Sequence, residues 1–117
     1  MVAIFNRNGI VVGWKETDSI IDLGNRHRAF VKDTKLYSCR GVYLGEFKNG
    51  YFWDCTGKAV AFLEGATSGP LRPITRIPPI PPIPAIAPLK PIPPIPPLPP
   101  IHGLSWSDLS FEEFLGC

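Results

Sequence analysis

The sequence predicts an all-β fold: four β-hairpin repeats of 16 residues in a compact domain, followed by a polyproline II tail and a short C-terminal helical anchor. Three observations predict it. All 15 prolines of the 117-residue chain lie between Pro70 and Pro100, the part before them aligns with itself at a shift of 16 residues, and aliphatic residues recur at every third position of the proline-rich part. We therefore divide the chain into residues 1–66, 67–103 and 104–117.

The first domain is predicted from four copies of the repeat, repeats 1 to 4, which align without gaps. The first two positions of every copy are apolar or aromatic, as expected of a strand that begins in a core. The sixth position is always glycine or asparagine, which tolerate the positive φ of a tight hairpin turn. The copies begin at Ile4, Ile20, Leu36 and Phe52, and their sixth positions are Gly9, Asn25, Gly41 and Gly57. Each copy is therefore predicted to form one hairpin with two short strands.

The tenth position of each repeat holds glycine or alanine, and an aromatic residue follows it in three copies, whereas repeat 3 has Glu46 there. A small residue beside a large ring indicates that two backbones approach closely and that the ring covers the gap. The turns between copies read "ETDS", "KDTK" and "KNGY". Because an isolated hairpin is barely stable in water, we expect the four to pack around a common centre with their aliphatic residues inward.

Repeat 2 is the weakest match, because Arg26, His27 and Arg28 replace the usual aliphatic residues. A solvated turn or strand face is the favoured interpretation of this cluster. The alternative is a contact with a phosphate or an acidic partner, which guanidinium groups bind well. This hairpin is therefore expected to have an exposed or interacting face.

The proline-rich tail carries an aliphatic residue at every third position. Proline-dense chain adopts polyproline II, a left-handed helix with three residues per turn, so this spacing places the aliphatic residues along one edge. We call them the aliphatic stripe and predict that they are the oligomerisation site. The stripe comprises Leu71, Ile74, Ile77, Ile80, Ile83, Ile86, Leu89, Ile92, Ile95, Leu98, Ile101 and Leu104.

The length of the tail indicates what covers the stripe. A straight rod from Leu71 to Ile101 would extend about 93 Å, whereas a domain of roughly 65 residues is only about 30 Å across. Either the tail folds back near "PAIAP", residues 84–88, or tails of several chains bundle with their stripes inward, which we favour. A disordered linker is a further alternative. So is a ligand for a proline-recognising partner protein, since Arg76 and Lys90 each precede prolines at third positions.

The chain's last residues are predicted to form an anchor that packs on a hairpin domain, its own or that of a neighbouring chain. Ser110 followed by Glu113 fits a helix capping box, and Gly116 can end the short helix. Apolar residues on one side of that helix, together with a tryptophan before it, form the anchor. These residues are Trp106, Phe111, Phe114 and Leu115.

The stretch "GVYLGEFKNGYFWDCTGKAVAFLEGATSGPLRP", the three-residue repeat after it and the ending "GLSWSDLSFEEF" resemble the bacterial proteins described as four-fold β-flower proteins. This resemblance implies a compact β domain of four hairpins followed by a periodic tail. It assigns no activity to the chain. The tail departs from the family pattern, because prolines occupy positions where other members often carry basic residues.

The three cysteines, Cys39, Cys55 and Cys117, show neither C-x-x-C nor Cys/His ligand spacing. An odd number of cysteines without such spacing favours free thiols over a disulfide framework. Cys39 and Cys55 occupy the same position of adjacent repeats, so the alternative is that they bind a soft metal or oxidise together. Two thiols without a second ligand pair make a poor zinc site, and we predict neither a metal nor another cofactor.

The net charge, the prolines and the first residues of the chain exclude further classes of function. A formal charge of +2 gives too weak a field to indicate nucleic acid or an anionic membrane as partner. The prolines exclude a membrane-spanning helix, and the start "MVAIFNRNGIVV" lacks the pattern of a secretory signal, which predicts a cytoplasmic protein. We expect a non-enzymatic structural or interaction protein that forms homo-oligomers through the aliphatic stripe. The alternatives are the partner-binding module and an enzyme or metal protein that uses the cysteines and the "RHR" cluster.

Overall fold

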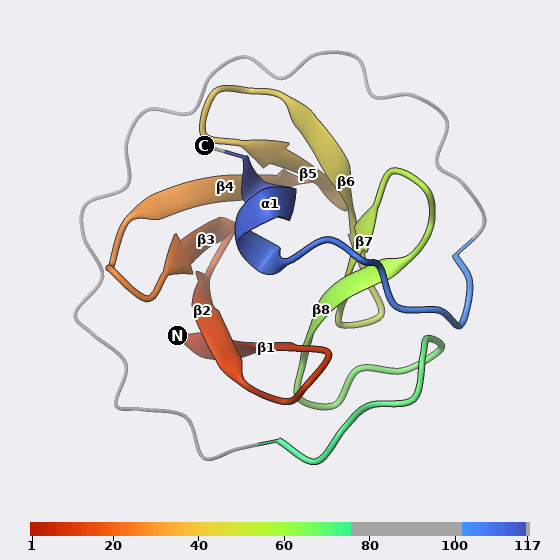
Figure 1. The fold of residues 1–117 in the computed structure, drawn as a ribbon. Coiled ribbons are helices and arrows are strands. Elements are labelled where there is room, and N and C mark those ends of the chain that lie inside the picture. The colour runs from red at the N-terminus through yellow and green to blue at the C-terminus, as the bar shows by residue number, and fades with distance from the viewer. Residues whose placement is uncertain (76–101, 117) are drawn as a thin grey trace.

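The computed structural model describes residues 1–75 and 102–116 of the chain. Eight antiparallel strands follow one another around a closed barrel, and one short helix lies over it (Figure 1). The elements are β1 (Val2–Asn6), β2 (Val11–Glu16), β3 (Ser19–Asp22), β4 (His27–Lys32), β5 (Lys35–Ser38), β6 (Tyr43–Lys48), β7 (Tyr51–Asp54), β8 (Ala59–Leu63) and α1 (Phe111–Leu115). The predicted all-β fold of four hairpins is confirmed.

The four predicted hairpin turns lie at the sixth position of each repeat. This position adopts a positive φ in every copy, of 76° at Gly9, 63° at Asn25, 82° at Gly41 and 86° at Gly57. The turn residue's backbone N–H donates to the carbonyl of the third position in the same repeat, as in the bond from Gly9 to Asn6 of 2.9 Å. The backbone conformation therefore favours glycine and asparagine at this position.

Each hairpin has the same irregularity in its register. In β1 the pairing with β2 shifts between Ile4 and Phe5, and equivalent shifts occur in the other three hairpins. Such bulges bend a strand and increase its twist, which helps eight short strands to curve into a barrel. Pairing of Ile4 with Leu63 and of Phe5 with Phe62 joins β1 to β8 and closes the barrel.

The first two residues of each repeat enter different apolar surroundings, because neighbouring side chains of a strand point to opposite faces. The first residues are all completely buried in one cluster that also holds the helix, and they are Ile4, Ile20, Leu36 and Phe52. Three of the second residues, Phe5, Ile21 and Trp53, pack instead in a cluster with Tyr51 and Phe62. Both faces of the small sheet are therefore partly covered by apolar contacts.

The small tenth position permits close approach of the backbone, as the sequence predicts. A Cβ atom at Gly13 would lie 2.6 Å from the carbonyl oxygen of Ile21 in the neighbouring strand and 3.4 Å from the ring of Phe111. Gly13 therefore leaves room for both β3 and the helix.

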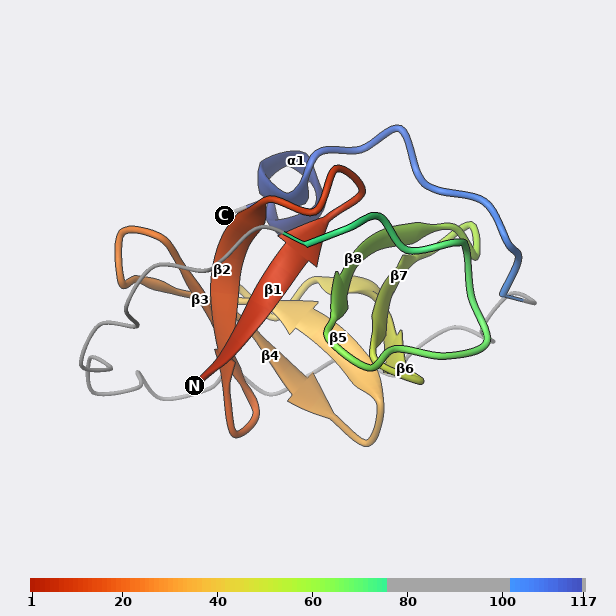
Figure 2. The ribbon, with the colours of Figure 1, turned by 90° about the horizontal axis from the view of Figure 1, so that it is seen from below.

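Helix α1 covers one end of the barrel (Figures 1 and 2). The side chain of Ser110 accepts a hydrogen bond from the backbone of Glu113, whose carboxylate accepts one from the backbone of Ser110. Gly116 ends the helix in the left-handed region at φ 70°, so both predicted caps are present. In the described ranges 1–75 and 102–116, no helix is long and apolar enough to cross a membrane.

Candidate functional site

Residues 102–116, which we call the C-terminal segment, run from the side of the barrel to its helix-covered end (Figure 2). The segment runs parallel to the start of β8 and pairs with it at an isolated β-bridge between Ala59 and Trp106. Ala59 donates its backbone N–H to Ser105 over 3.1 Å and accepts one from Ser107 over 2.7 Å. Gly103 donates to the carbonyl of Gly57 over 3.0 Å. Backbone pairing with repeat 4 therefore fixes the direction in which the segment crosses the barrel.

The residues predicted as anchor all contact the barrel. The ring of Trp106 lies 6.1 Å from that of Tyr51 and 5.8 Å from that of Phe62. In the helix, Phe111, Phe114 and Leu115 are each at most 5% exposed and belong to the same cluster as the first residues of the repeats. We call this end of the barrel, with the groups that bind the segment, the docking site.

An ion pair between a buried arginine and a largely exposed glutamate ties the helix to repeat 2. The guanidinium of Arg28, only 7% exposed as a residue, contacts Asp22 over 3.1 Å and Glu112 of α1 over 2.9 Å. A second hydrogen bond to Glu112, of 3.2 Å, makes that contact bidentate. The interpretation of the "RHR" cluster as a solvated face is therefore wrong for Arg28, which binds an acidic group of its own chain.

The charges in this ion pair reinforce one another. The hydrogen bonds to Glu112 and Asp22 raise the pKa of Arg28 despite its burial. Burial acts to raise the pKa of Asp22, but hydrogen bonds from the backbone of Arg26 and the side chain of Arg28 outweigh it and hold that pKa below its ordinary value. The carboxylate of Asp22 is thus kept ionised opposite the guanidinium.

A second charged contact holds the start of the segment on repeat 3. The carboxylate of Glu46 accepts from Lys35 over 2.9 Å and lies 2.8 Å from Nε2 of His102, whose ring stacks on that of Trp53 at 4.3 Å. Burial acts to raise the pKa of Glu46, but the bonds to Lys35 and His102 outweigh it and lower that pKa. His102 marks the point where the chain leaves the tail, and here it is also bound to the barrel.

Arg28 and Glu46, which make these two contacts, are also departures from the repeat. At the ninth position Val12, Leu44 and Val60 are aliphatic, whereas repeat 2 has Arg28. The eleventh position is aromatic in repeats 1, 2 and 4, whereas repeat 3 has Glu46. Both departures bind the C-terminal segment.

The four residues at the third position of the repeats have a structural role that the sequence did not lead us to predict. In every copy its side-chain oxygen accepts hydrogen bonds from the backbone two and four residues later, which braces the hairpin turn. The residues are Asn6, Asp22, Ser38 and Asp54. The signal was available, because all four are turn-forming polar residues in one column of the alignment.

Asp54 has a further role in this set. Its side chain also bonds the hydroxyl groups of Thr56 and Ser107. Burial acts to raise the pKa of Asp54, but these hydrogen bonds and those from the turn's backbone lower it. Repeat 4 thereby holds the middle of the C-terminal segment by a side chain as well as by its backbone.

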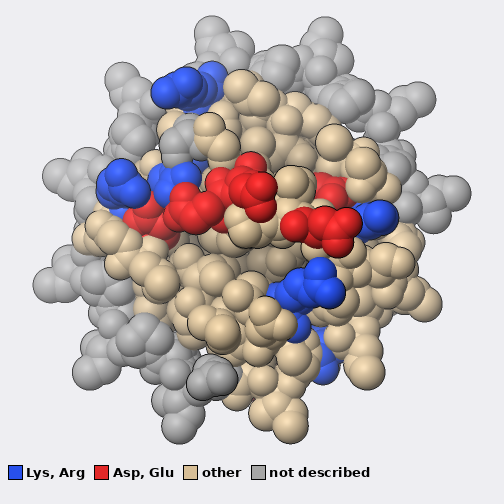
Figure 3. All heavy atoms as spheres, viewed as in Figure 1, with Lys and Arg blue, Asp and Glu red and all other residues tan. Residues whose placement is uncertain are grey.

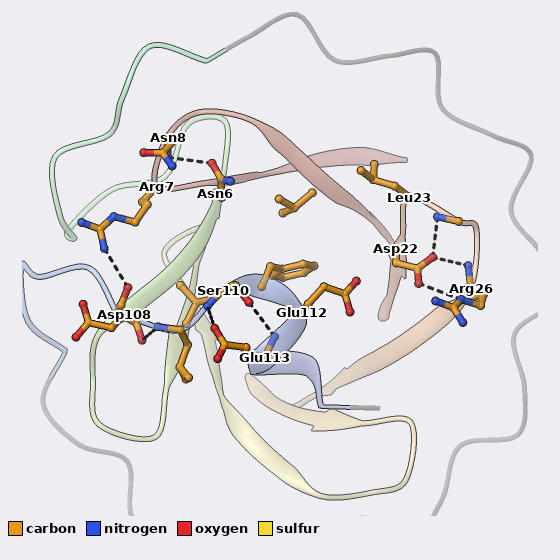
Figure 4. Close-up of a pocket in the computed structure, with 16 residues that line it drawn as sticks. Asn6, Arg7, Asn8, Asp22, Leu23, Arg26, Asp108, Ser110, Glu112 and Glu113 are labelled. Atoms are coloured by element: carbon orange, nitrogen blue, oxygen red, sulfur yellow. Dashed lines mark hydrogen bonds and ion pairs between the residues drawn. The ribbon is translucent and has the colours of Figure 1, made fainter.

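A cavity of about 500 Å³ lies between the first two hairpin turns and residues 107–113 (Figure 4). Acidic side chains gather across the middle of this face, with basic groups beside them (Figure 3). The carboxylates of Asp22, Glu112 and Glu113 in its lining are already engaged by guanidinium or backbone N–H groups of the chain. The cavity is therefore a product of the docking contacts, and we assign no ligand to it.

Three of the twelve stripe residues lie in the described ranges, and all three are exposed: Leu71 by 92%, Ile74 by 95% and Leu104 by 77%. The other nine, from Ile77 to Ile101, lie outside the described residues. The backbone next to Leu71 is nevertheless held on the barrel, since the hydroxyl of Tyr51 donates to the carbonyl of Pro70 over 2.5 Å.

The cysteines differ from the prediction at one position. Cys39 takes part in a disulfide, so the expectation of a free thiol there is wrong. Cys55 is a free, exposed thiol, as expected, and Cys117 lies outside the described residues. The pairing of Cys39 is a tertiary contact for which spacing alone gave no signal. Across the described part of the chain, no group of three His, Cys, Asp or Glu side chains could hold a metal ion.

A closed barrel of four equivalent hairpins, capped at one end by its own C-terminal segment, defines a small β-barrel protein with four-fold internal repetition. A family model described as "4-fold beta flower protein" matches residues 2–115, and the chain belongs to this family. No curated protein and no solved structure matches it in the corresponding comparisons.

Proposed function

We propose that this beta flower protein is a non-enzymatic structural protein that self-associates through the aliphatic stripe of its tail. The partner of the stripe is the stripe of a second copy. The observation that carries the proposal is the exposure of Leu71, Ile74 and Leu104 at the two places where the described chain meets the tail.

These residues are exposed although their own backbone has access to the barrel. The carbonyl of Ile74 lies directly over Gly9, where a Cβ atom would collide with it, and Gly103 next to Leu104 bonds to Gly57. The chain at both ends of the tail is thus close enough to the barrel to bury these side chains, yet they remain in solvent. Other apolar side chains must cover them if they are to leave water.

The size of the aliphatic stripe favours a second copy of the chain as the partner that buries it. A soluble monomer rarely exposes more than a few hundred Å² of contiguous apolar surface, and full burial of one Leu or Ile side chain stabilises by about 1.5 to 3 kcal/mol. Twelve such side chains with a common period of three offer the same surface to every other copy. Parallel or antiparallel association of two stripes would remove them from water together.

The test is a triple variant in which Ile80, Ile83 and Ile92 are changed to Ser. The mass of the native particle, measured by light scattering, is expected to fall toward the 12.9 kDa of one chain, while circular dichroism of the barrel is unchanged. The matched control changes the preceding prolines, Pro79, Pro82 and Pro91, to Ala and should have a weaker effect.

An unchanged mass in the isoleucine variant would overturn the proposal. So would a monomeric wild type. That second result would favour the other interpretation of the tail, a proline-rich ligand for a partner protein.

A further inference from the structure

The disulfide of Cys39 lies in the hairpin turn between β5 and β6, next to the docking site. Cys39 is exposed, and its backbone N–H donates to the carbonyl of Arg28 over 3.0 Å. Arg28 is the residue whose guanidinium binds Glu112 of α1. The sulfur of Cys39 is therefore attached to the part of the barrel that holds the helix.

The cysteines of the chain indicate which residue pairs with Cys39. The chain has three cysteines, of which Cys55 is a free thiol. The cysteine left to pair with Cys39 is therefore Cys117, which lies outside the described residues. In the sequence it directly follows Gly116, where α1 ends, and in the view of Figure 1 the end of α1 is directed toward the turn between β5 and β6. A bond at this position would hold the end of the helix on the barrel.

Helix α1 depends on its attachments, because it has only five residues and a helix of that length is not stable in water by itself. Backbone hydrogen bonds to Ala59 hold the C-terminal segment as far as Ser107. Beyond that point the helix is held by its buried apolar side chains and by Glu112, whose side chain is 69% exposed. Since an ion pair with an exposed member is screened by water and salt, a covalent bond at the end of the helix would add substantially to its attachment.

From these observations we propose that the disulfide joins Cys39 to Cys117 and acts as a redox switch on the docking site. While the bond is intact the helix stays on the barrel, and reduction of the bond releases the helix. This inference goes beyond the proposed self-association, because it concerns the C-terminal segment and not the aliphatic stripe.

The reductant is a dithiol. One of its thiolates attacks Sγ of Cys39 and expels the sulfur of Cys117 as a thiolate, which leaves a mixed disulfide. The second sulfur of the dithiol then closes the dithiol's own disulfide and releases the thiolate of Cys39. Both thiolates take up protons, so two electrons and two protons pass from the dithiol to the protein. The exposure of Cys39 and of Gly116 leaves the bond open to this attack.

The switch controls whether one end of the barrel is covered. The apolar side chains of α1 belong to the cluster that also holds the first residues of the four repeats, all of them completely buried. These first residues are Ile4, Ile20, Leu36 and Phe52. Release of the helix would expose part of this cluster to water. The state of the bond therefore determines which surface the barrel presents at this end.

Peptide mapping without reductant tests the pairing. Native full-length protein is alkylated, then unfolded and digested with trypsin. We expect a pair of peptides that joins Cys39 to Cys117 and an alkylated Cys55, and a single-chain band on a non-reducing denaturing gel. A free Cys39, a bond from Cys39 to Cys55 or a disulfide-linked dimer would overturn the inference.

Amide hydrogen exchange tests the switch. After reduction with dithiothreitol, residues 111–116 should exchange at least about thirty-fold faster than in the oxidised protein, a factor that corresponds to about 2 kcal/mol, the lower end of what a disulfide contributes. Removal of dithiothreitol and reoxidation should restore slow exchange. A bond that dithiothreitol does not reduce in the folded protein, or exchange that reduction leaves unchanged, would overturn the switch.

Two variants serve as a matched pair, because they change the same position of adjacent repeats. Cys39→Ser should exchange at residues 111–116 as fast as the reduced wild type and should not respond to dithiothreitol. Cys55→Ser should behave like the wild type in both states. Slow exchange in the barrel amides of the same samples shows that both variants are folded. Exchange in Cys39→Ser as slow as in the oxidised wild type would contradict the switch.

The two proposals are measured separately. Particle mass reports on association through the aliphatic stripe, and exchange of residues 111–116 reports on release of the helix. A protein that is monomeric but responds to dithiothreitol would overturn the first proposal and support the second. An assembly that depends on the stripe and ignores dithiothreitol would do the reverse.

Discussion

Repeats 1 and 4 keep the four-fold pattern of the barrel at its ninth and eleventh positions, whereas repeat 2 departs at the ninth and repeat 3 at the eleventh. Where the pattern holds, aliphatic and aromatic side chains build the two apolar clusters. Where it is broken, Arg28 and Glu46 bind the C-terminal segment through Glu112 and His102.

The repeated residues thus form the barrel, and the exceptions determine how the C-terminal segment lies on it. Four-fold repetition gives the barrel four similar surfaces, but the single C-terminal segment can bind in only one orientation at a time. A buried charge on the barrel can select one orientation, because burying a charge destabilises the fold unless an opposite charge or a hydrogen-bond partner pairs with it. Here each buried charge is paired with the segment that it orients.

The largest effect is expected when the pattern is restored at the ninth position. Arg28→Leu replaces the exception by an aliphatic residue like those of the other repeats and removes the buried guanidinium from Asp22, which then keeps only the exposed guanidinium of Arg26. The free energy of unfolding, measured in urea, should fall by about 2 to 3 kcal/mol. Leu44→Val at the same position of repeat 3 is the matched control and should cost less than about 1.5 kcal/mol. A variant Arg28→Leu as stable as the wild type would show that the departure is not a structural anchor.

Alanine substitutions at the third position of the repeats are expected to lower the stability by smaller amounts that differ from one repeat to another. Asn6→Ala and Ser38→Ala remove the oxygen that braces a turn and should each cost about 1 kcal/mol. Asp54→Ala removes the same brace together with the bonds to Thr56 and Ser107, and should cost about 2 kcal/mol. Thermal unfolding of the three variants side by side measures this. Equal losses would contradict a separate role of repeat 4 in holding the C-terminal segment.

The smallest effect concerns the pH dependence of the contact at Glu46. Its pKa in the folded protein is lowered from the ordinary 4.5, so its contribution to stability is present above that value and is lost as the pH falls through the folded pKa. The difference in unfolding free energy between wild type and Glu46→Gln should therefore shrink as the pH is lowered below about 4.5. Asp22 and Asp54 titrate in both proteins, so the difference isolates Glu46. A difference that stays constant down to low pH would contradict the pairing with Lys35 and His102.

Much of the barrel could be predicted from the sequence because its determinants repeat. Gly9 and its three equivalents mark turns in a column, and the apolar pairs that begin at Ile4 mark strands by the same spacing. The capping box from Ser110 to Glu113 is a local pattern and was equally readable. Local and periodic signals of this kind need no knowledge of distant contacts.

The docking site could be predicted only in part, for a physical reason. Arg28 and Glu46 were visible as mismatches, but their partners lie 84 and 56 positions away and follow no period. The pairing of Cys39 is another contact of this kind. A buried charge in a repeat indicates that a partner exists, whereas the three-dimensional arrangement determines which residue it is.

The junction between β1 and β8 has a consequence for how the molecule can meet others. Since every strand of the described barrel has a neighbour on each side, none presents a free row of N–H and C=O groups to which a foreign strand could add. Removing β1 would expose two such rows at once, on β2 and on β8. An N-terminal truncation should therefore make the protein prone to fibrillar aggregation.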